Sequence, residues 1–457
     1  MKLLFVAANL GAGGAERVMS LLANQFVEKE YKVEFVFLKK DVRYYPLQQQ
    51  VTITLANNEC GSDSLTKKLL WMRRYIKKQK PDVVFAFRIS IYLVTLLSLI
   101  GIKVPVIASE RIDPNYNSIL EKILQRILLP LTDWFVVQTS AIKAYYPKFI
   151  QRKTSVIFNP VSEKVFEVLN ENKTSYDNDD DNDNYLNTKI SVDKGIDTEK
   201  LNSQKEKKII SVGRLHSQKN QEMMIEAFAR VADDFPEWKL VIYGEGPERA
   251  KLEKLIASLN ENDSYLNTKL TKDKNVGAEE QNTLKDEDDN HLITKDTKDK
   301  DIDVEKQKTQ NEVNGDDRLM VNDEGLMVNG EGLKIKERIL LPGRSEKVIE
   351  EMNESEIFAF SSDYEGMSNA VVEAFCVGLP IITTKVSGTE DFIKDGENGF
   401  LLDIGDTDGM EKAMRILMSN EVLRRKMGEK NRMEAEQFKI EHIFQQWEDV
   451  VNKVVNH

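Results

Sequence analysis

The chain has 457 residues, of which 31% are charged, and a formal net charge of −12. A chain of this length usually folds into more than one core, so the sequence predicts two domains. Only two cysteines occur, Cys60 and Cys376, which argues against a disulfide-rich secreted protein and fits a reducing cytoplasm. The most apolar stretch, residues 89–107, is interrupted by a glycine, a lysine and a proline, and the remaining run is too short to span a bilayer.

The chain alternates apolar, β-branched runs with amphipathic segments. "KLLFVAA", "KVEFVFL", "DVVFAF", "VPVIAS" and "DWFVVQT" lie within residues 1–169, and the rhythm begins again after residue 206 with "KKIISVG", "WKLVIYG", "RILLPG", "EIFAFSS" and "PIITT". This pattern is typical of β-α-β units in a parallel sheet. We predict an α/β protein with two similar domains, residues 1–169 and 206–439, followed by a C-terminal helix at residues 440–457.

Two polar segments interrupt this pattern, and they carry most of the negative charge. Residues 170–205 contain nine acids and five bases, and residues 261–334 contain twenty acids and eleven bases. Neither has sustained periodicity, so we predict a disordered linker between the domains and a disordered insert within the second domain. Residues 1–169, in contrast, hold 24 bases and 14 acids, and the first domain is therefore strongly basic.

A glycine loop, "NLGAGGAERV", joins the first strand to the first helix. Gly13 and Gly14 allow the backbone to approach a ligand closely, and the helix N-terminus offers free N–H groups to an anion. The loop does not match a dinucleotide fingerprint, because Glu16 stands where the third glycine is needed and lysines follow the second strand where an acid is expected. A tight turn that binds nothing is the alternative.

The second domain opens with "SVGRLHSQKN", which places Arg214 and Lys219 between a strand and a helix. Two cations at a helix N-terminus can stabilise a diphosphate, although a solvated turn is the alternative. Gly213 precedes this pair, and "YGEGPER" adds Gly244 and Gly246 after the next strand. All of them belong to the carboxyl edge of the sheet, where open α/β sheets bind ligands.

The stretch "EGMSNAVVEAF" sets Glu365 and Glu373 eight positions apart. Gly366 is a poor residue for a helix interior, whereas Ser368 and Asn369 are good N-caps for a helix that continues to Cys376. We therefore expect Glu365 in the loop before this helix and Glu373 about one turn inside it. A solvated helix face with an ordinary cap is the alternative.

Four motifs, "GAGGAERV", "VGRLHSQKN", "GEGP" and "EGMSNAVVEAFCVGLPIITT", occur in this order over nearly all of the ordered sequence. Together they resemble the large retaining glycosyltransferase family of group 1 and family 4, which includes sucrose synthase and bacterial mannosyltransferases. The resemblance implies the GT-B fold, in which two Rossmann-like domains face each other across a cleft. It also implies sugar transfer from a nucleotide-sugar, with no metal and no other cofactor. The "DND" triplets resemble the Asp-x-Asp motif of metal-dependent transferases, but they occur here only in low-complexity sequence.

The resemblance assigns a role to each motif. Arg214 and Lys219 would offset charge on the departing diphosphate, and Glu365 would face the donor sugar. Glu373 would accept hydrogen bonds from the ribose hydroxyls. The other donor-site residues are Gly13, Gly14, Gly213, Gly244 and Gly246, together with the backbone N–H groups of Gly366, Met367 and Ser368.

The chain departs from the family at one position. Many relatives place a histidine in the N-terminal domain over the transferred sugar, but no histidine occurs in residues 1–169 of this chain. The corresponding region reads "ASERIDPNYN", which makes Glu110, Arg111 and Asp113 candidates for contact with donor or acceptor. His216, beside Arg214, is a loop residue or, alternatively, an acid or base.

We expect a hexosyltransferase that uses a UDP-sugar and extends a lipid-linked glycan for a cell-surface polysaccharide. A nucleotide-sugar epimerase of the same fold and a non-catalytic sugar-nucleotide-binding protein are the alternatives. No nucleic-acid partner is expected. Residues 65–80 place seven bases among leucines, Trp71, Tyr75 and Ile76. As a helix, this segment suits the anionic inner face of the cell membrane, or else packs on the sheet with solvated lysines.

Overall fold

The structure is a computed structural model that describes residues 1–61, 64–174, 207–259 and 334–456. One compact unit, Met1–Ile256 with Arg338–His457, contains two parallel sheets. Helix α8 (Glu163–Thr174) continues five residues past the expected boundary of the first domain. The rest of the predicted linker and nearly all of the predicted insert lie outside the described residues.

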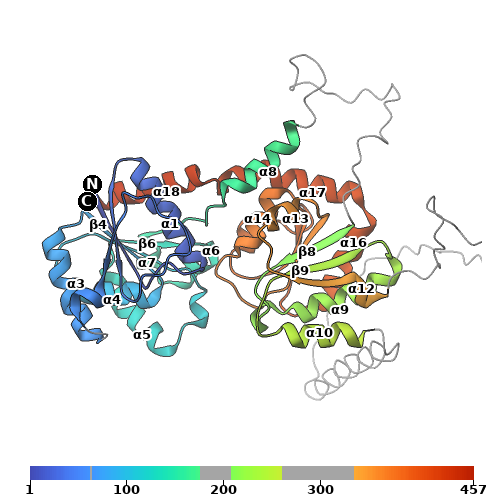
Figure 1. Cartoon of the computed structure of the whole chain (residues 1–457), viewed down its shortest axis with the longest axis horizontal. Coiled ribbons are helices and arrows are strands. Elements are labelled where there is room, and N and C mark those ends of the chain that lie inside the picture. Colours follow the sequence, from blue (N-terminus) through green and yellow to red (C-terminus); the bar gives the residue numbers. More distant parts are fainter. Residues whose placement is uncertain (62–63, 175–206, 260–333, 457) are drawn as a thin grey trace, which may run out of the picture. The chain divides into compact units, whose positions relative to one another are not determined.

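The first sheet has seven parallel strands in the order β3-β2-β1-β4-β5-β6-β7. Figure 1 labels β4 and β6 of this sheet, with helices such as α1 and α4 around them. Its strands carry buried apolar side chains on both faces, as expected for a sheet that helices cover on each side. The strands are β1 (Lys2–Ala7), β2 (Lys32–Phe37), β3 (Thr52–Leu55), β4 (Val83–Phe87), β5 (Val106–Ser109), β6 (Trp134–Val137) and β7 (Thr154–Val156).

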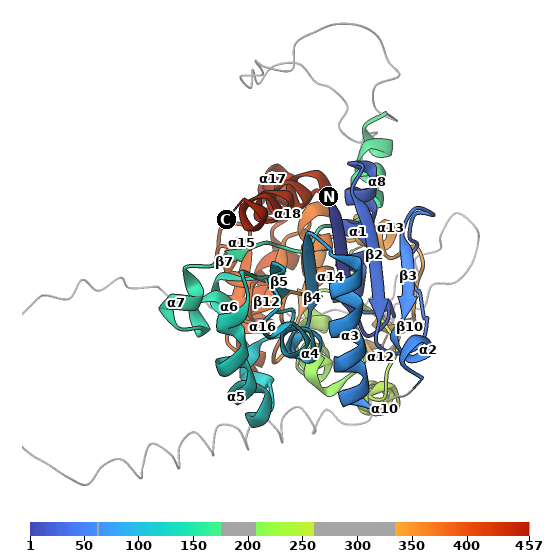
Figure 2. The same cartoon turned by 90° about the vertical axis from the view of Figure 1, so that its left-hand side faces the viewer.

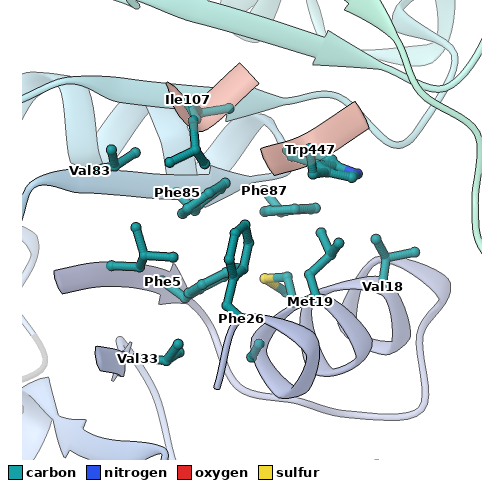
Figure 3. Packing of buried hydrophobic residues seen from close by; sticks show 14 of the residues in the cluster. Phe5, Val18, Met19, Phe26, Val33, Val83, Phe85, Phe87, Ile107 and Trp447 are labelled. Atoms are coloured by element: carbon teal, nitrogen blue, oxygen red, sulfur yellow. The ribbon is translucent and has the colours of Figure 1, made fainter. Parts of the chain in front are cut away.

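One face of this sheet packs against α1 (Gly14–Glu28) and α18 (Ile440–Val455), the last helix of the chain. Figure 3 shows phenylalanines of the strands and of α1 gathered in this core, with Trp447 of α18 beside Phe87. The rings of Phe5 and Phe85 stack 4.5 Å apart, and those of Phe87 and Trp447 stack 5.4 Å apart. The predicted C-terminal helix therefore belongs to the core of the first sheet.

The opposite face is covered by a layer of helices from the middle of the first domain. Helix α3 buries Met72 and Ile76, and α4 is apolar on almost every side. The layer contains α3 (Leu65–Gln79), α4 (Ile89–Leu99), α5 (Ile119–Leu128), α6 (Ser140–Tyr145) and α7 (Lys148–Gln151), and the short α2 (Ala56–Cys60) precedes it.

The second sheet has six parallel strands in the order β10-β9-β8-β11-β12-β13. The strands are β8 (Lys208–Val212), β9 (Lys239–Tyr243), β10 (Ile339–Gly343), β11 (Ile357–Phe360), β12 (Ile381–Thr384) and β13 (Gly399–Leu402). This second parallel sheet confirms the predicted α/β architecture with two Rossmann-like domains.

Helices cover both faces of the second sheet. On one face, α8, α13 (Val348–Asn353) and α14 (Asn369–Val377) enclose a core centred on Phe358, Phe375 and Phe438. On the other face, α9 (Gln221–Val231) packs against α16 (Thr407–Ser419) (Figure 1). The remaining helices are α10 (Arg249–Ser258), α12 (Ile335–Arg338), α15 (Thr389–Phe392) and α17 (Glu421–Glu434). Within the described ranges, no helix is both long enough and apolar enough to cross a bilayer.

Candidate active site

The strand order of the second sheet predicts where a ligand would bind. Strands β8 and β11 are neighbours, and the strand order runs outward in opposite directions from this pair. Open α/β sheets bind ligands at such a switch point, beside the carboxyl ends of the two strands. Arg214 and Lys219 follow β8, and Glu365 follows β11. The topology thus brings together residues that are far apart in the sequence.

Lys219 and Glu365 form an ion pair at this switch point. The Lys219 ammonium donates a hydrogen bond to Glu365 Oε1, and the two side chains are 13% and 12% exposed. Ser362 Oγ donates to the same carboxylate oxygen at 2.9 Å. The Lys219 Nζ also lies 4.7 Å from the centroid of the Phe360 ring. These contacts fix a cation and an anion side by side where a charged ligand would enter.

Arg214 and His216 differ from Lys219 in their surroundings. The Arg214 side chain is exposed, and it forms no ion pair with a carboxylate of the described residues. His216 begins a single 3₁₀ turn, Ser217–Lys219, and its Nδ1 accepts a hydrogen bond from the Gln218 backbone N–H at 3.3 Å. The His216 ring therefore helps to hold the turn that carries Lys219.

The glycines of this edge stand where two loops touch. A Cβ at Gly246 would lie 2.1 Å from the Leu215 carbonyl oxygen, and one at Gly244 would lie 1.8 Å from the Gly213 oxygen. Gly244 also has φ of +150°, a conformation that favours glycine. At Gly213 itself a Cβ would meet only the Lys219 side chain, at 3.5 Å, which is ordinary contact. Gly244 and Gly246 therefore let the loop after β9 pack against the loop that carries Arg214.

The start of α14 offers free backbone donors. The helix begins at Asn369, with Ser368 as an N-cap whose side chain makes no capping hydrogen bond. The backbone N–H groups of Gly366, Met367 and Ser368 donate to no other group in the part of the chain that the structure describes. Unpaired N–H groups at a helix N-terminus attract anions. Glu365 stands directly before these donors.

Glu373 lies in the second turn of α14 and pairs with a residue that the sequence analysis did not single out. Arg17 Nη1, from the first turn of α1, donates to Glu373 Oε1 at 2.7 Å. Both side chains are mostly buried, at 17% and 13% exposure. Arg17 stands inside the "GAGGAERV" motif, and that position was the available signal. Gly14, beside it, would place a Cβ 3.4 Å from the Asn369 amide nitrogen.

The first sheet has its own switch point, between β1 and β4. A cavity of about 320 Å³ opens at the carboxyl ends of these strands, and its lining includes Glu16, Lys39, Lys68 and Arg88. Arg88 Nη1 donates to Glu16 Oε1 at 3.3 Å, and the Arg88 backbone has φ of +72°. Gly13 caps α1 above Glu16, where a Cβ would lie 2.1 Å from Glu16 Oε2. The strained backbone of Arg88 and its pairing with Glu16 could not be predicted from the strand patterns alone.

The segment that follows β5 turns two of its three candidate side chains inward. Glu110 is 1% exposed, and it accepts hydrogen bonds from the Tyr92 hydroxyl at 3.0 Å and the Gln125 amide at 3.2 Å. Burial raises the pKa of Glu110 to about 7. Arg111 is 6% exposed; its Nη1 donates to Asn159 Oδ1 at 2.9 Å, and burial lowers its pKa to about 9.

Asp113, in contrast, caps a 3₁₀ turn, Pro114–Tyr116, by accepting the Asn115 N–H at 2.9 Å. Its carboxylate thus has a local structural partner.

Both parallel sheets place charged pairs at their carboxyl edges, where open α/β sheets bind ligands. The sequence model of "Glycosyl transferases group 1" matches residues 193–279 and 327–434, and that of "Glycosyltransferase Family 4" matches residues 12–164. The chain belongs to this group 1 and family 4 glycosyltransferase family, as the motifs predicted. It is a glycosyltransferase with the GT-B fold.

Relatives are similar over the whole chain at low identity. A Campylobacter jejuni protein, "GalNAc-alpha-(1->4)-GalNAc-alpha-(1->3)-diNAcBac-PP-undecaprenol alpha-1,4-N-acetyl-D-galactosaminyltransferase", is 22% identical over 100% of this chain and 99% of its own. The Anabaena protein HepE, solved with UDP, is 13% identical with a TM-score of 0.66 over 99% of this chain and 100% of its own. Sucrose-phosphate synthase of Thermosynechococcus elongatus gives a TM-score of 0.66 at 13% identity, covering 99% of each chain. At such identities, the structural likeness shows the fold alone.

Proposed function

We propose that this glycosyltransferase moves a hexose from a UDP-sugar to a lipid-linked glycan and retains the configuration of the sugar carbon. The ion pair of Lys219 and Glu365 at the switch point, beside the unpaired N–H groups of residues 366–368, is the observation that carries the proposal. The name of the Campylobacter relative specifies an undecaprenol-linked acceptor, and HepE was solved with UDP. These names support the choice of acceptor and of nucleotide.

In the proposed reaction, the bond between the sugar C1 and the diphosphate oxygen breaks, and an acceptor hydroxyl oxygen forms the new bond to C1 on the same face. The hydroxyl proton passes to the departing diphosphate. Lys219 and Arg214 would stabilise the negative charge that grows on this leaving group. Glu365 would orient the sugar, and the N–H groups behind it would orient the diphosphate. Because Lys219 and Arg214 supply the positive charge, no bound metal is required for charge compensation.

Glu373 would accept hydrogen bonds from the two ribose hydroxyls, because one carboxylate can receive both hydroxyls of a vicinal diol. Its present partner, Arg17, would then share the carboxylate or turn to the diphosphate. The basic cavity of the first domain, with Lys39, Lys68 and Arg88, would receive the anionic part of the acceptor. Glu110, Arg111 and Asp113 remain predicted contacts of the ligands.

The test is incubation with a panel of UDP-sugars and GDP-mannose, with and without a polyprenyl-diphosphate-linked glycan. We expect a product one hexose longer with a UDP-sugar, and NMR should show the same anomeric configuration as in the donor. A change of sugar stereochemistry without acceptor would favour the epimerase alternative. UDP binding without any turnover across a broad acceptor panel would favour a non-catalytic binding protein.

Helix α3 is the segment for which we predicted membrane contact. Its Trp71 and Tyr75 rings stack 4.8 Å apart and pack toward the core, while Lys67, Arg74 and Lys77 are exposed. Arg73 instead donates to two backbone carbonyl oxygens at the end of α4, Ser98 O at 3.2 Å and Ile100 O at 2.6 Å. The proposed contribution of α3 is therefore electrostatic attraction to an anionic surface, without insertion of its aromatic residues.

A further inference from the structure

Three polar side chains lie together at the carboxyl edge of the first sheet. Arg111 follows β5, Gln138 follows β6 and Asn159 follows β7, and these strands are neighbours in the sheet. Figure 2 labels β7, β5 and β4 of this sheet in the order that the topology gives. All three residues are buried, at 6%, 3% and 3% exposure. We call them the Asn159 cluster, because the other two residues donate to Asn159 Oδ1, Arg111 Nη1 at 2.9 Å and Gln138 Nε2 at 2.8 Å.

Arg111 is a buried cation whose side-chain partner is an uncharged amide. Its Nε and Nη2 have no hydrogen-bond partner among the described residues, and none of the described carboxylates forms an ion pair with it. Its guanidinium carbon lies 5.0 Å from the centre of the Phe87 ring and 5.5 Å from that of Trp447. Burial of a cation without a carboxylate costs free energy, so stability alone does not favour this arrangement.

The chemistry of Arg111 determines the orientation of the Asn159 amide. A guanidinium only donates hydrogen bonds, so Asn159 Oδ1 faces Arg111 and the amide nitrogen Nδ2 is left for another partner. That partner is Asn369, the first residue of α14, whose Oδ1 accepts from Asn159 Nδ2 at 2.7 Å. A carboxylate at residue 159 could accept from Arg111 but could not donate to Asn369 Oδ1. The amide therefore links the first sheet to the start of α14.

The Asn159 cluster also contacts the residues directly before α14. The Asn159 backbone N–H donates to the Met367 sulfur at 3.4 Å. A Cβ at Gly366 would lie 2.5 Å from the Arg111 carbonyl oxygen, so the two backbones approach closely. The cluster thus supports residues 366–368, whose backbone N–H groups donate to no other group of the described chain.

We propose that Asn159 is a positioning residue for the donor site. Through Met367 and Asn369 it sets the direction of the N–H groups of residues 366–368, which receive the diphosphate in the proposed function, so the inference rests on that function. Donors held in place before the reaction stabilise charge without having to reorganise. Asn159 belongs to the first domain and acts on the nucleotide only through these residues. If Asn159 instead only packs the domains together, a different nucleotide preference follows.

The test compares binding of UDP and of UMP by calorimetric titration. Glu365, which would face the sugar, directly precedes the free N–H groups, so these should contact the phosphate that carries the sugar, which UMP lacks. Asn369→Ala removes the hydrogen bond to Asn159 but leaves Asn159 as the acceptor for Arg111, and alanine favours the helix. We expect UDP to bind about five- to tenfold more weakly, the usual cost of one hydrogen bond, and UMP to bind nearly as it does to the wild type.

A second variant tests whether the two asparagines act through one contact. Asn159→Ala should weaken UDP binding to the same extent, and it should also lower the unfolding temperature, because Arg111 loses its acceptor. The variant with both asparagines replaced should bind UDP like either single variant, because the two effects are not additive for residues in direct contact.

The matched control is Asp391→Ala. It removes the hydrogen bond that the Ser140 backbone N–H donates to Asp391 Oδ2 at 2.7 Å. This bond also joins a residue that follows β6 to the second domain, but it does not involve residues 366–369. The control should bind UDP and UMP like the wild type.

Several results would overturn the inference while the wild type still binds UDP and the proposed function stands. They are wild-type affinity for UDP in Asn369→Ala, an equal loss of UDP and UMP binding, additive losses in the double variant, and a selective loss of UDP binding in Asp391→Ala. Failure of the wild type to bind UDP would overturn the proposed function and this inference together.

Discussion

Arg214 and Lys219 belong to the same proposed diphosphate site, but only Lys219 has a carboxylate partner in the structure. Arg214→Ala should therefore leave the free energy of unfolding almost unchanged. It should lower the transfer rate by about 10² to 10³, the usual cost of removing one group that stabilises developing charge. The measurements are steady-state kinetics and denaturant unfolding. Arg425→Ala, at an exposed helix position on α17, is the control and should change neither quantity much.

Lys219→Ala should also slow transfer by about 10² to 10³, but with an additional loss of stability. Among the described residues, the Glu365 carboxylate would keep only Ser362 as a side-chain partner while remaining mostly buried. An unsatisfied buried group of this kind costs about 1 to 3 kcal/mol. A rate close to that of the wild type in both the Arg214 and the Lys219 variants would remove the two residues from the proposed site.

Glu373 allows a test that separates ribose recognition from a structural role. If its carboxylate receives the ribose hydroxyls, UDP should bind more tightly than 2′-deoxy-UDP, by about tenfold for one charge-assisted hydrogen bond. Glu373→Gln should reduce this preference strongly, and calorimetric titration of the two nucleotides measures it. Equal preference in the variant and the wild type would show that Glu373 only pairs with Arg17.

Glu110 predicts a pH dependence of stability. Its ordinary pKa is 4.5, and burial raises it to about 7 in the folded chain. Between these pH values the folded state keeps a proton that the unfolded state has lost, so the free energy of unfolding should fall as pH rises. The slope from this group is at most about 1.4 kcal/mol per pH unit. Glu110→Gln should flatten the curve of unfolding free energy against pH from pH 4.5 to 7. Glu441→Gln, an exposed control, should leave the curve unchanged. Parallel curves for Glu110→Gln and the wild type would contradict the raised pKa of Glu110.

The sequence was informative about the site wherever a motif directly followed a strand. Arg214, Lys219 and Glu365 could be placed on one sheet edge because parallel strands direct their carboxyl ends to the same side. The pairing of Arg17 with Glu373 could not be predicted, because it joins residues 356 positions apart through packing that local patterns do not encode. The inward orientation of Glu110 was hidden for the same reason, since a carboxylate is normally expected at the surface.

At the scale of elements, the contact between the loops after β8 and β9 depends on glycine. Gly246→Ala would place a Cβ 2.1 Å from the Leu215 carbonyl oxygen, so one of the two loops must move. We expect weaker UDP binding and a loss of stability of about 1 to 3 kcal/mol. Gly213→Ala, in the same site, meets the Lys219 side chain at an ordinary contact distance of 3.5 Å, so it is the matched control for stability alone. Thermal unfolding should therefore separate the two variants, and an equal loss of stability would contradict the close approach.

The sequence predicted the central strands of both sheets, and also β10 at the edge of the second sheet. β1, β4 and β11 read as continuous apolar runs because helices cover both faces of their sheets. The outer strands β3 and β7 are short and only partly buried, so they lack that signal. Helix α5 shows the opposite limit, because its apolar residues predict a helix but not that Leu128 is buried while Ile119 and Ile123 are exposed.

At the scale of the whole molecule, the C-terminal helix completes a core that begins at the other end of the sequence. α18 contributes Phe444, Trp447 and Val451 to the core beside β1 and β4. Its amphipathic pattern was visible in the sequence, but the sheet that receives it was not, because hydrophobic burial has no directional preference. The first domain therefore depends on residues that are synthesised after the second domain.

Residues 262–333 lie outside the described residues, and their composition makes a prediction for the whole chain. The match to the group 1 family model omits residues 280–326. The described fold includes α10 before this segment and β10 after it. A segment this polar cannot bury enough apolar surface to offset the entropy of ordering it. Replacing residues 262–333 with a flexible Gly-Ser linker of about ten residues should keep the unfolding temperature and the transfer rate.

The replacement must retain Arg338, the last residue of α12. Arg338 is 2% exposed, and its Nη1 donates to the carbonyl oxygens of Ala232 and Phe235 at 2.5 and 3.1 Å. A second variant with the same linker and Arg338→Ala should lose stability by about 1 to 3 kcal/mol, because it loses the hydrogen bonds that a buried, charged guanidinium donates. Aggregation or inactivity of the first variant would contradict the prediction and show that residues 262–333 contribute to folding or bind a ligand. Limited proteolysis provides an independent check, since the first cuts in the intact chain should fall within this segment.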